Sequence, residues 1–434
     1  MSATALSQFG ALGVSERLVE ALERAGLKEP TPIQTEAIPP ALEGRDVLGC
    51  AQTGTGKTAA FVIPMIERLA AGPKGKPRGL ILAPTRELAF QIQGTVDKFG
   101  RSRGIFSTTI VGGADMHAQV RGLRQRPDII IATPGRLLDH MWQGTILFSN
   151  LSIVVLDEAD RMLDMGFAPQ LNQIIEALPD TRQTLLFSAT MPDNLDDLAR
   201  MSLNDPFKAL VAKSATLVDG VTHTVHHTNN SEKTPLLLSI LKETEGSVLI
   251  FTRTKHRADR IGETLEKVGC RVAVLHAGRR LPQRRAALEG FRRGRFEILV
   301  ATDVASRGLD VDNIRHVINY DLPHVPEDYV HRVGRTARMK ATGWATSFVT
   351  GEDNRSLRMI ERLLGKAVPC APGSRPPSIS HVATRSSRPG YGNQNGPRGP
   401  RPGHGNHNGP RGPQPDRSEQ NQPGHHPRSS AYTF

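Results

Sequence analysis

Four consecutive apolar residues, Ile153 to Leu156, run directly into Asp157-Glu158-Ala159-Asp160. An apolar run without alternation is typical of a strand that is buried on both faces, as in a parallel sheet covered by helices. In such sheets the ligands bind beyond the carboxyl ends of the strands. The acidic tetrad therefore predicts a metal and phosphate site at the end of a buried parallel strand.

A second phosphate-binding element lies upstream, where residues 46–50, apolar apart from Asp46, lead into Ala51-Gln52-Thr53-Gly54-Thr55-Gly56-Lys57-Thr58. The glycines allow backbone N–H groups to face a β-phosphate, and the Lys57 ammonium neutralises phosphate oxygens. Thr58 is the expected Mg²⁺ ligand. Ala51 stands where the general pattern has glycine, but alanine is the next smallest side chain. A glycine-rich loop alone is weak evidence, whereas this loop and an acidic strand end in one domain favour a nucleoside triphosphate site.

Two acidic and two basic side chains are the candidates for phosphoryl chemistry. Asp157 is expected to orient Mg²⁺ through its waters, and Glu158 to position and deprotonate the attacking water. The alternative is a solvated acidic helix cap. Arg335 and Arg338, in the cluster at 331–338, are the candidate arginine fingers for the γ-phosphate, although arginines at this spacing are more often an exposed helix face.

Length and charge limit the class of protein. A chain of 434 residues exceeds one ordinary core, so two folded domains are expected. No uncharged apolar stretch is long enough for a membrane span, and the first ten residues lack the pattern of a secretion signal, so we expect a cytoplasmic location. The three cysteines are far apart and favour neither a disulfide framework nor a zinc site. A net charge of +12 indicates a polyanionic partner.

Apolar strands alternate with amphipathic helices in two series, which predicts an α/β fold of two parallel-sheet domains. The predicted strands are residues 47–50, 80–83, 107–111, 129–132, 153–156 and 184–187 in the first series, and 248–252, 272–275, 298–301, 316–319 and 345–349 in the second. The predicted boundaries are a first domain at 1–207, a linker at 208–230, a second domain at 231–369 and a tail at 370–434.

The tail has a composition typical of disorder. From residue 371 onward it contains no Leu or Lys, and Asn-Gly-Pro-Arg-Gly-Pro occurs at 395–400 and again at 408–413. Its eight arginines against two acidic residues give a net charge of +6. It is either a sequence-tolerant RNA tether, with Tyr391, Tyr432 and Phe434 for stacking, or a solubilising linker.

In their order along the chain these elements resemble the DEAD-box ATP-dependent RNA helicases of superfamily 2, RhlE-like bacterial members included, over about residues 9–365. The resemblance implies two RecA-like domains, ATP and Mg²⁺ as cofactors, and RNA as the polyanion. It also implies an adenine-reading element, in which Phe9 stacks on the base and Gln34, following Thr31, bonds the adenine edge. Gly308 and Asp310 are similar to the family's ATP-contacting segment in the second domain.

Further motifs are similar to the family's RNA-facing and coupling segments. The RNA-binding residues that the resemblance implies are Pro84, Thr85, Arg86, Gly113, Thr133, Pro134, Gly135, Arg136, Arg253 and Thr302. The residues that it implies for coupling hydrolysis to strand separation are Asp160, Ser188, Thr190 and His331. Hydroxyls, glycine N–H groups and arginines suit sugar and phosphate contacts, which read no sequence. Each motif taken alone is as compatible with an ordinary turn.

Two functions remain open from the sequence. One is an ATP-dependent helicase that unwinds or remodels RNA duplexes and RNA–protein complexes; the other is an ATP-gated RNA clamp that serves as an assembly platform with little unwinding. A DNA helicase of the same superfamily is a weaker third. Ribosome-assembly or RNA-decay proteins are the expected partners, and the core is expected to be monomeric.

Overall fold

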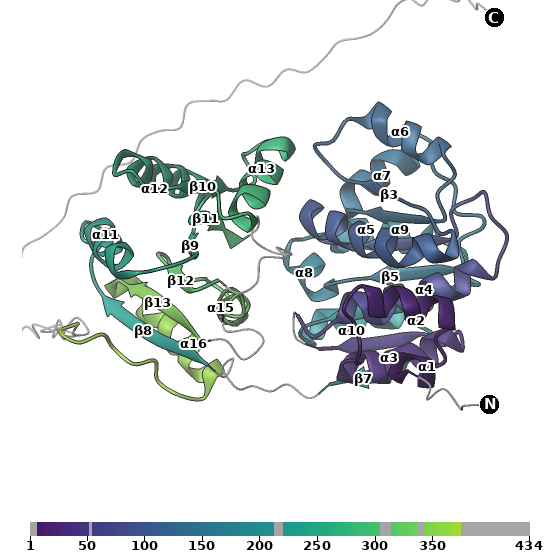
Figure 1. Ribbon diagram of the computed structural model, residues 1–434, viewed down its shortest axis with the longest axis horizontal. Helices are drawn as coiled ribbons and strands as arrows, with labels where there is room; N and C mark the ends of the chain where they lie inside the picture. Colours follow the sequence, from purple (N-terminus) through teal and green to yellow (C-terminus); the bar gives the residue numbers. More distant parts are fainter. Residues whose placement is uncertain (1–6, 52–53, 212–219, 304–313, 337–341, 375–434) are drawn as a thin grey trace, which may run out of the picture. The chain divides into compact units, whose positions relative to one another are not determined.

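The computed structural model describes residues 7–51, 54–211, 220–303, 314–336 and 342–374. Two parallel sheets lie between helices, and the predicted α/β fold is confirmed; Figure 1 colours the first sheet and its helices from purple through blue to teal, and the second from teal through green to yellow. No helix in this part of the chain has the length and apolar character that a bilayer span requires.

The first sheet has seven parallel strands in the order β3-β4-β2-β5-β6-β1-β7. Its strands are β1 (Val47–Cys50), β2 (Gly79–Leu82), β3 (Ser107–Ile110), β4 (Ile129–Ala132), β5 (Ile153–Leu156), β6 (Gln183–Ser188) and β7 (Phe207–Leu210). Its helices are α1 (Gln8–Ala11), α2 (Glu16–Arg24), α3 (Pro32–Leu42), α4 (Lys57–Ala70), α5 (Arg86–Gly100), α6 (Met116–Arg124), α7 (Pro134–Trp142), α8 (Ala159–Asp164), α9 (Ala168–Glu176) and α10 (Asp193–Ser202), with a 3₁₀ turn η1 (Arg101–Arg103).

Neighbouring residues of each central strand belong to opposite cores, because side chains alternate across a sheet. Ile153 and Val155 of β5 pack with α1 to α5, whereas Val154 and Leu156 pack with α7 to α10. Burial of such a side chain contributes roughly 1.5–3 kcal/mol to the stability of the fold, so a strand covered on both faces is stabilised by the burial of side chains on each face. This is why the central strands read as unbroken apolar runs.

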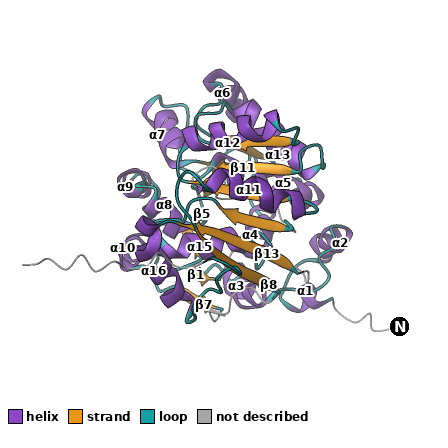
Figure 2. Ribbon diagram, turned by 90° about the vertical axis from the view of Figure 1, so that its left-hand side faces the viewer, coloured by secondary structure: helices purple, strands orange, loops and turns teal. Residues whose placement is uncertain are grey.

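The second sheet has six parallel strands in the order β10-β11-β9-β12-β13-β8. Its strands are β8 (Val221–His227), β9 (Val248–Thr252), β10 (Val272–Leu275), β11 (Ile298–Thr302), β12 (His316–Asn319) and β13 (Gly343–Val349). Its helices are α11 (Lys233–Glu243), α12 (Lys255–Lys267), α13 (Leu281–Arg292), α15 (Pro326–Val333) and α16 (Asn354–Leu364), with a 3₁₀ turn η2 (Gly351–Asp353). Helices α11 and α12 cover one face, and α13, α15 and α16 cover the other. Figure 2 draws the strands in orange between the purple helices.

Two strands lie inside the stretch predicted as a linker or at its edge. Phe207–Leu210 pairs with β1 as the outer strand β7, and Val221–His227 pairs with β13 as the outer strand β8. In β7 only Ala209 is buried, and β8 is rich in histidine and threonine. These two outer strands bury little side-chain surface, so their sequences lack the apolar runs that identified the central strands.

Buried histidines hold part of the second sheet together. His316 of β12 bonds Thr346 Oγ1 through Nε2 at 2.8 Å, and His223 of β8 bonds the Tyr329 hydroxyl through Nδ1 at 2.9 Å. Burial, with repulsion from Lys366, lowers the pKa of His223 to about 4. Burial, with repulsion from His226, lowers the pKa of His316 to about 4 as well.

We expect the second sheet's domain to lose stability as the pH falls from 6.5 towards 4. The unfolded chain takes up protons at these histidines near its ordinary pKa of 6.5, while the folded domain stays neutral until about 4. Each histidine then costs on the order of 1–2 kcal/mol at pH 5. Urea unfolding at pH 7 and pH 5 measures the loss. The His223→Phe/His316→Gln double variant should lose less on acidification than the wild type, and the exposed-site control His324→Gln should lose as much; an equal loss in all three would contradict the assignment.

Candidate functional site

The carboxyl edge of the first sheet divides into two halves. The loops after β1, β6 and β5, which are neighbours in the strand order, carry the phosphate loop, Ser188 to Thr190 and the acidic tetrad. The loops after β3, β4 and β2, also neighbours, carry the segments predicted to bind RNA. Parallel pairing alone therefore places two sets of polar loops side by side at one edge.

The phosphate loop has the backbone that its glycines predict. Gly54 and Gly56 have φ values of +87° and +91°, in the left-handed region that favours glycine. Lys57 begins α4, is buried, and donates from Nζ to the carbonyl oxygen of Ala51. Burial lowers the pKa of Lys57, while the nearby acidic tetrad raises it. Among the described residues this ammonium bonds a loop carbonyl, and an ammonium beside the backbone N–H groups of a glycine loop fits a polyphosphate.

Gln34 touches the phosphate loop directly. Its Oε1 accepts the backbone N–H of Thr31 at 3.0 Å, and its Nε2 donates to the carbonyl oxygen of Gly56 at 3.0 Å. The Thr31 hydroxyl is buried and has no hydrogen-bond partner among the described residues. The element predicted to read the base is therefore joined to the loop predicted to hold the phosphates.

The acidic tetrad is buried, and its neighbouring carboxylates repel one another. Burial, with repulsion from Glu158, raises the pKa of Asp157 to about 7, although Lys57 opposes the rise. Glu158 adopts φ +50° and ψ +51°, an uncommon conformation for a residue with a side chain. Its Oε2 lies 3.7 Å from Arg161 Nε and makes no hydrogen bond to any of the described residues. Oxygen ligands beside an ammonium suit a hard cation and its phosphate partner.

Asp160 joins the tetrad to the end of β6. Its Oδ2 accepts from the Thr190 hydroxyl at 2.8 Å, from the Thr190 N–H at 2.9 Å and from the Ala189 N–H at 3.2 Å. Although burial opposes it, these bonds hold the pKa of Asp160 below its ordinary value. The Ser188 hydroxyl donates to the Thr190 carbonyl oxygen at 2.5 Å. Three of the four residues predicted to act in coupling are thus brought into one hydrogen-bonded cluster.

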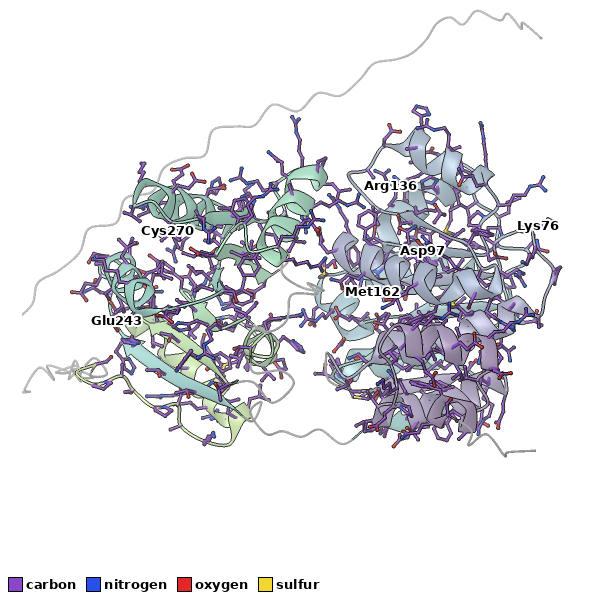
Figure 3. All side chains as sticks on the ribbon, in the orientation of Figure 1. Lys76, Asp97, Arg136, Met162, Glu243 and Cys270 are labelled. Atoms are coloured by element: carbon purple, nitrogen blue, oxygen red, sulfur yellow. The ribbon has the colours of Figure 1, made fainter. Side chains whose placement is uncertain are left out.

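The other half of the edge gathers the first domain's predicted RNA-binding residues. Thr85, after Pro84, caps α5 by accepting the N–H of Leu88 at 3.3 Å. Arg86 lies over Gly113, whose φ is +74°; a Cβ atom there would come within 2.4 Å of Nη1. Arg136, labelled in Figure 3, donates to the Ala114 carbonyl oxygen at 3.1 Å. Arginines, hydroxyls and glycine backbone at one edge suit a phosphate chain.

Thr133, Pro134 and Gly135 complete this half of the edge. The Thr133 N–H bonds the Ile110 carbonyl oxygen at 3.0 Å at the end of β3, and Pro134 is the first residue of α7. A Cβ atom on Gly135 would meet nothing within 4 Å. The turn therefore presents open backbone at the start of a helix, where N–H groups favour an anion.

The second domain presents its predicted residues at the carboxyl ends of neighbouring strands. Thr302 ends β11, and Arg253 follows β9, where its Nη2 bonds Asp353 Oδ1 at 3.0 Å. His331 lies on α15, and Arg335 follows that helix. The Arg335 carbonyl oxygen accepts the N–H of Ile314 at 3.2 Å, which fixes the start of the candidate finger segment.

Comparison with known proteins identifies the family. The DEAD/DEAH box helicase model matches residues 31–198, and the helicase conserved C-terminal domain matches residues 232–340. The chain belongs to the DEAD/DEAH box helicase family. The resemblance to the DEAD-box helicases that the sequence predicted is confirmed, and the likeness to RhlE-like members stays a prediction.

Individual relatives of this helicase are similar over most of its length. The ATP-dependent rRNA helicase RRP3 of Debaryomyces hansenii is 44% identical over 367 residues, which cover 84% of this chain and 76% of the relative. The DEAD-box ATP-dependent RNA helicase CshA of Bacillus cereus is 40% identical over 358 residues, 82% of this chain and 68% of the relative. The structure of S. cerevisiae Dbp5 bound to RNA and ADP BeF3 matches with a TM-score of 0.76 and 31% identity, over 84% of this chain and 96% of that one.

Some predicted site residues of this helicase lie outside the described residues: Gln52, Thr53, Gly308, Asp310 and Arg338. Phe9 is described, but it is only 1% exposed and packs in the core with Val14 and Leu18. Its stacking on a base stays a prediction, and this burial does not favour it.

Sequence reasoning missed a set of buried charged residues in the second domain, among them Lys233, Asp321 and Arg332. Lys233 is 2% exposed and bonds Asp321 Oδ1 at 3.1 Å. A charged side chain in the interior needs a partner, and the partners come from distant segments. A single charged residue beside an apolar run is a sequence signal of a buried charge, but it does not identify the residue that pairs with that charge.

Proposed function

We propose that the protein is an ATP-dependent RNA helicase that couples ATP binding and hydrolysis to local unwinding or remodelling of RNA duplexes. The observation that carries the proposal is the divided carboxyl edge of the first sheet. Nucleotide-type loops occupy one half, RNA-type loops occupy the other, and the Asp160–Thr190 cluster lies in the nucleotide half. Family membership makes this combination of ligands the expected one.

The nucleotide chemistry follows from the residues at the ends of β1 and β5. Lys57 and the glycine backbone bind the phosphates, and Glu158 positions a water and accepts its proton. Asp157, partly through water, and Thr58 would hold Mg²⁺, which neutralises charge developing on the phosphate oxygens. Burial raises the pKa of Asp157, and a Mg²⁺ ion held there would favour its charged form.

The second domain supplies the remaining positive charge in this proposal. ATP and single-stranded RNA each span both domains, so the binding of either one offsets part of the cost of closure for the other. Closure brings Arg335 and Arg338 to the γ-phosphate and bends the RNA path, which separates a short duplex. Hydrolysis reopens the domains, and no translocation is required.

The test is the ATPase rate of the purified full-length chain with no nucleic acid, with single-stranded RNA and with single-stranded DNA of the same sequence. RNA should stimulate turnover strongly and DNA only weakly; stimulation by both equally would overturn the RNA assignment. A duplex-release assay then separates the helicase from the clamp. A clamp retains RNA with a non-hydrolysable ATP analogue but displaces no strand.

The pathway and location are proposed from the relatives. Relatives named as rRNA helicases favour a role beside ribosome-assembly proteins, with RNA decay as the alternative. A cytoplasmic location and a monomeric core agree with a chain that acts on RNA through its own two domains.

Removal of the basic tail, residues 375–434, should weaken RNA binding. A tether with a net charge of +6 raises the local concentration of RNA through contacts that release counterions. The RNA concentration for half-maximal ATPase should rise about tenfold, and its dependence on salt should become shallower. The cut falls after Ser374, whose hydroxyl accepts the His227 N–H at 2.6 Å. An unchanged RNA requirement would make the tail a solubilising linker.

A further inference from the structure

Arg332 of α15 lies at the centre of a buried polar network. Its Nε and Nη2 donate to the two carboxylate oxygens of Asp303, each at 2.6 Å. Its Nη1 donates to Asn319 Oδ1 at 2.8 Å and to the Asp321 carbonyl oxygen at 2.7 Å. The guanidinium carbon lies 4.8 Å from the centroid of the Phe251 ring. Three strand ends, those of β9, β11 and β12, thus converge on one side chain.

These contacts fix what Arg332 can do. The side chain is only 3% exposed, and four hydrogen bonds use most of the five N–H donors of a guanidinium. A bidentate pair with a carboxylate is geometrically specific, and breaking it leaves a charge buried without its partner. The hydrogen bonds of the Arg332 guanidinium are therefore made within its own domain, whereas the guanidinium of an arginine finger must be free to reach a phosphate.

The network joins segments with different predicted ligands. Asp303 directly follows Thr302, the predicted RNA contact at the end of β11. Asp321 accepts the backbone N–H of Arg253, a second predicted RNA contact, at 3.0 Å through Oδ2, and Arg257 Nη1 at 2.5 Å through Oδ1. The helix that carries the central guanidinium ends at the segment of the candidate finger Arg335.

The geometry points to Arg332 as a positioning residue that couples RNA binding to the placement of the arginine finger. This inference rests on the proposed function and adds a residue to it. A shift of Thr302 or Arg253 on RNA binding moves the Asp303 carboxylate or the Asp321 carbonyl. Because both are bonded to one rigid guanidinium, α15 moves with them, and Arg335 moves with α15.

The test measures coupling with full-length chains. In the wild type, RNA should tighten the binding of a non-hydrolysable ATP analogue, and the analogue should tighten RNA binding by the same factor. Arg332→Lys keeps the positive charge but cannot form the bidentate pair with Asp303. We therefore expect the coupling factor, by which each ligand tightens the binding of the other, to fall about tenfold. The affinities for RNA alone and for the analogue alone should change less than about threefold, because the ligand-contacting side chains remain.

A second variant and a control make the result decisive. Asp303→Asn removes the charge with little change of shape, and the double variant with Arg332→Lys should be no worse than either single variant, since both break one link. Arg315→Lys is the matched control. Arg315 directly precedes β12, so it lies at the opposite end of the sheet from the network, where its guanidinium stacks on the Trp344 ring. Its coupling should equal that of the wild type.

Each outcome has a defined meaning. Coupling that survives in folded Arg332→Lys and Asp303→Asn, with only the melting temperature lowered, makes the network structural and overturns the inference. Lost turnover in Arg332→Lys with normal turnover in Asp303→Asn makes Arg332 a third finger and also overturns it. A wild type that RNA does not stimulate refutes the proposed function instead.

Discussion

Glu158→Gln should lower RNA-stimulated ATP turnover at least about 100-fold while the chain still binds ATP. Gln fills the same buried volume but cannot accept the proton of the attacking water. Glu158 is 4% exposed and follows the buried strand β5, and its Oε2 has no hydrogen-bond partner in the part of the chain that the structure describes. Phosphate release under single-turnover conditions measures the chemical step, and titration with a fluorescent ATP analogue measures binding.

The matched control is Glu176→Gln at the exposed end of α9, which should leave turnover unchanged. A Glu158→Gln chain that hydrolyses ATP at the wild-type rate would remove the general base from the proposal. Loss of ATP binding along with turnover would instead show that the substitution disturbs the strained backbone at this residue.

Gly56→Ala should weaken ATP binding by tenfold or more. At φ +91° a side chain is strained by roughly 1–2 kcal/mol, and the new Cβ atom would come within 2.3 Å of Gln34 Nε2. Gln34 can move away only by giving up its bond to the Gly56 carbonyl oxygen, so the base-reading element loses its anchor. A loss of about 1.4 kcal/mol corresponds to each tenfold change in affinity.

Isothermal titration with ATP and with GTP measures this effect, and the preference for ATP should fall together with the affinity. Gly94→Ala in α5 is the control, because a Cβ atom there meets nothing within 4 Å and its φ is not positive. Equal ATP affinity in the Gly56→Ala and Gly94→Ala chains would show that the loop tolerates a side chain and that Gln34 does not act through it.

The amino-acid sequence by itself determined the two parallel sheets, the central strands and the phosphate and acidic loops. These features are local: an apolar run such as Ile153 to Leu156 is typical of a strand buried on both faces, and the glycines before Lys57 allow the left-handed backbone that a phosphate loop needs. The boundaries of the central strands needed only small corrections at their ends, for example Gly79–Leu82 in place of residues 80–83.

Only the tertiary structure decided which distant groups meet. Gln34 reaches Gly56 across 22 residues, Asp160 reaches Thr190 across 30, and Arg332 reaches Asp303 across 29. The outer strands β7 and β8 were likewise invisible in the sequence. Partners in a polar network, or an outer strand's neighbour, are set by which strand ends the fold brings together, and a single polar residue carries no local pattern that names its partner.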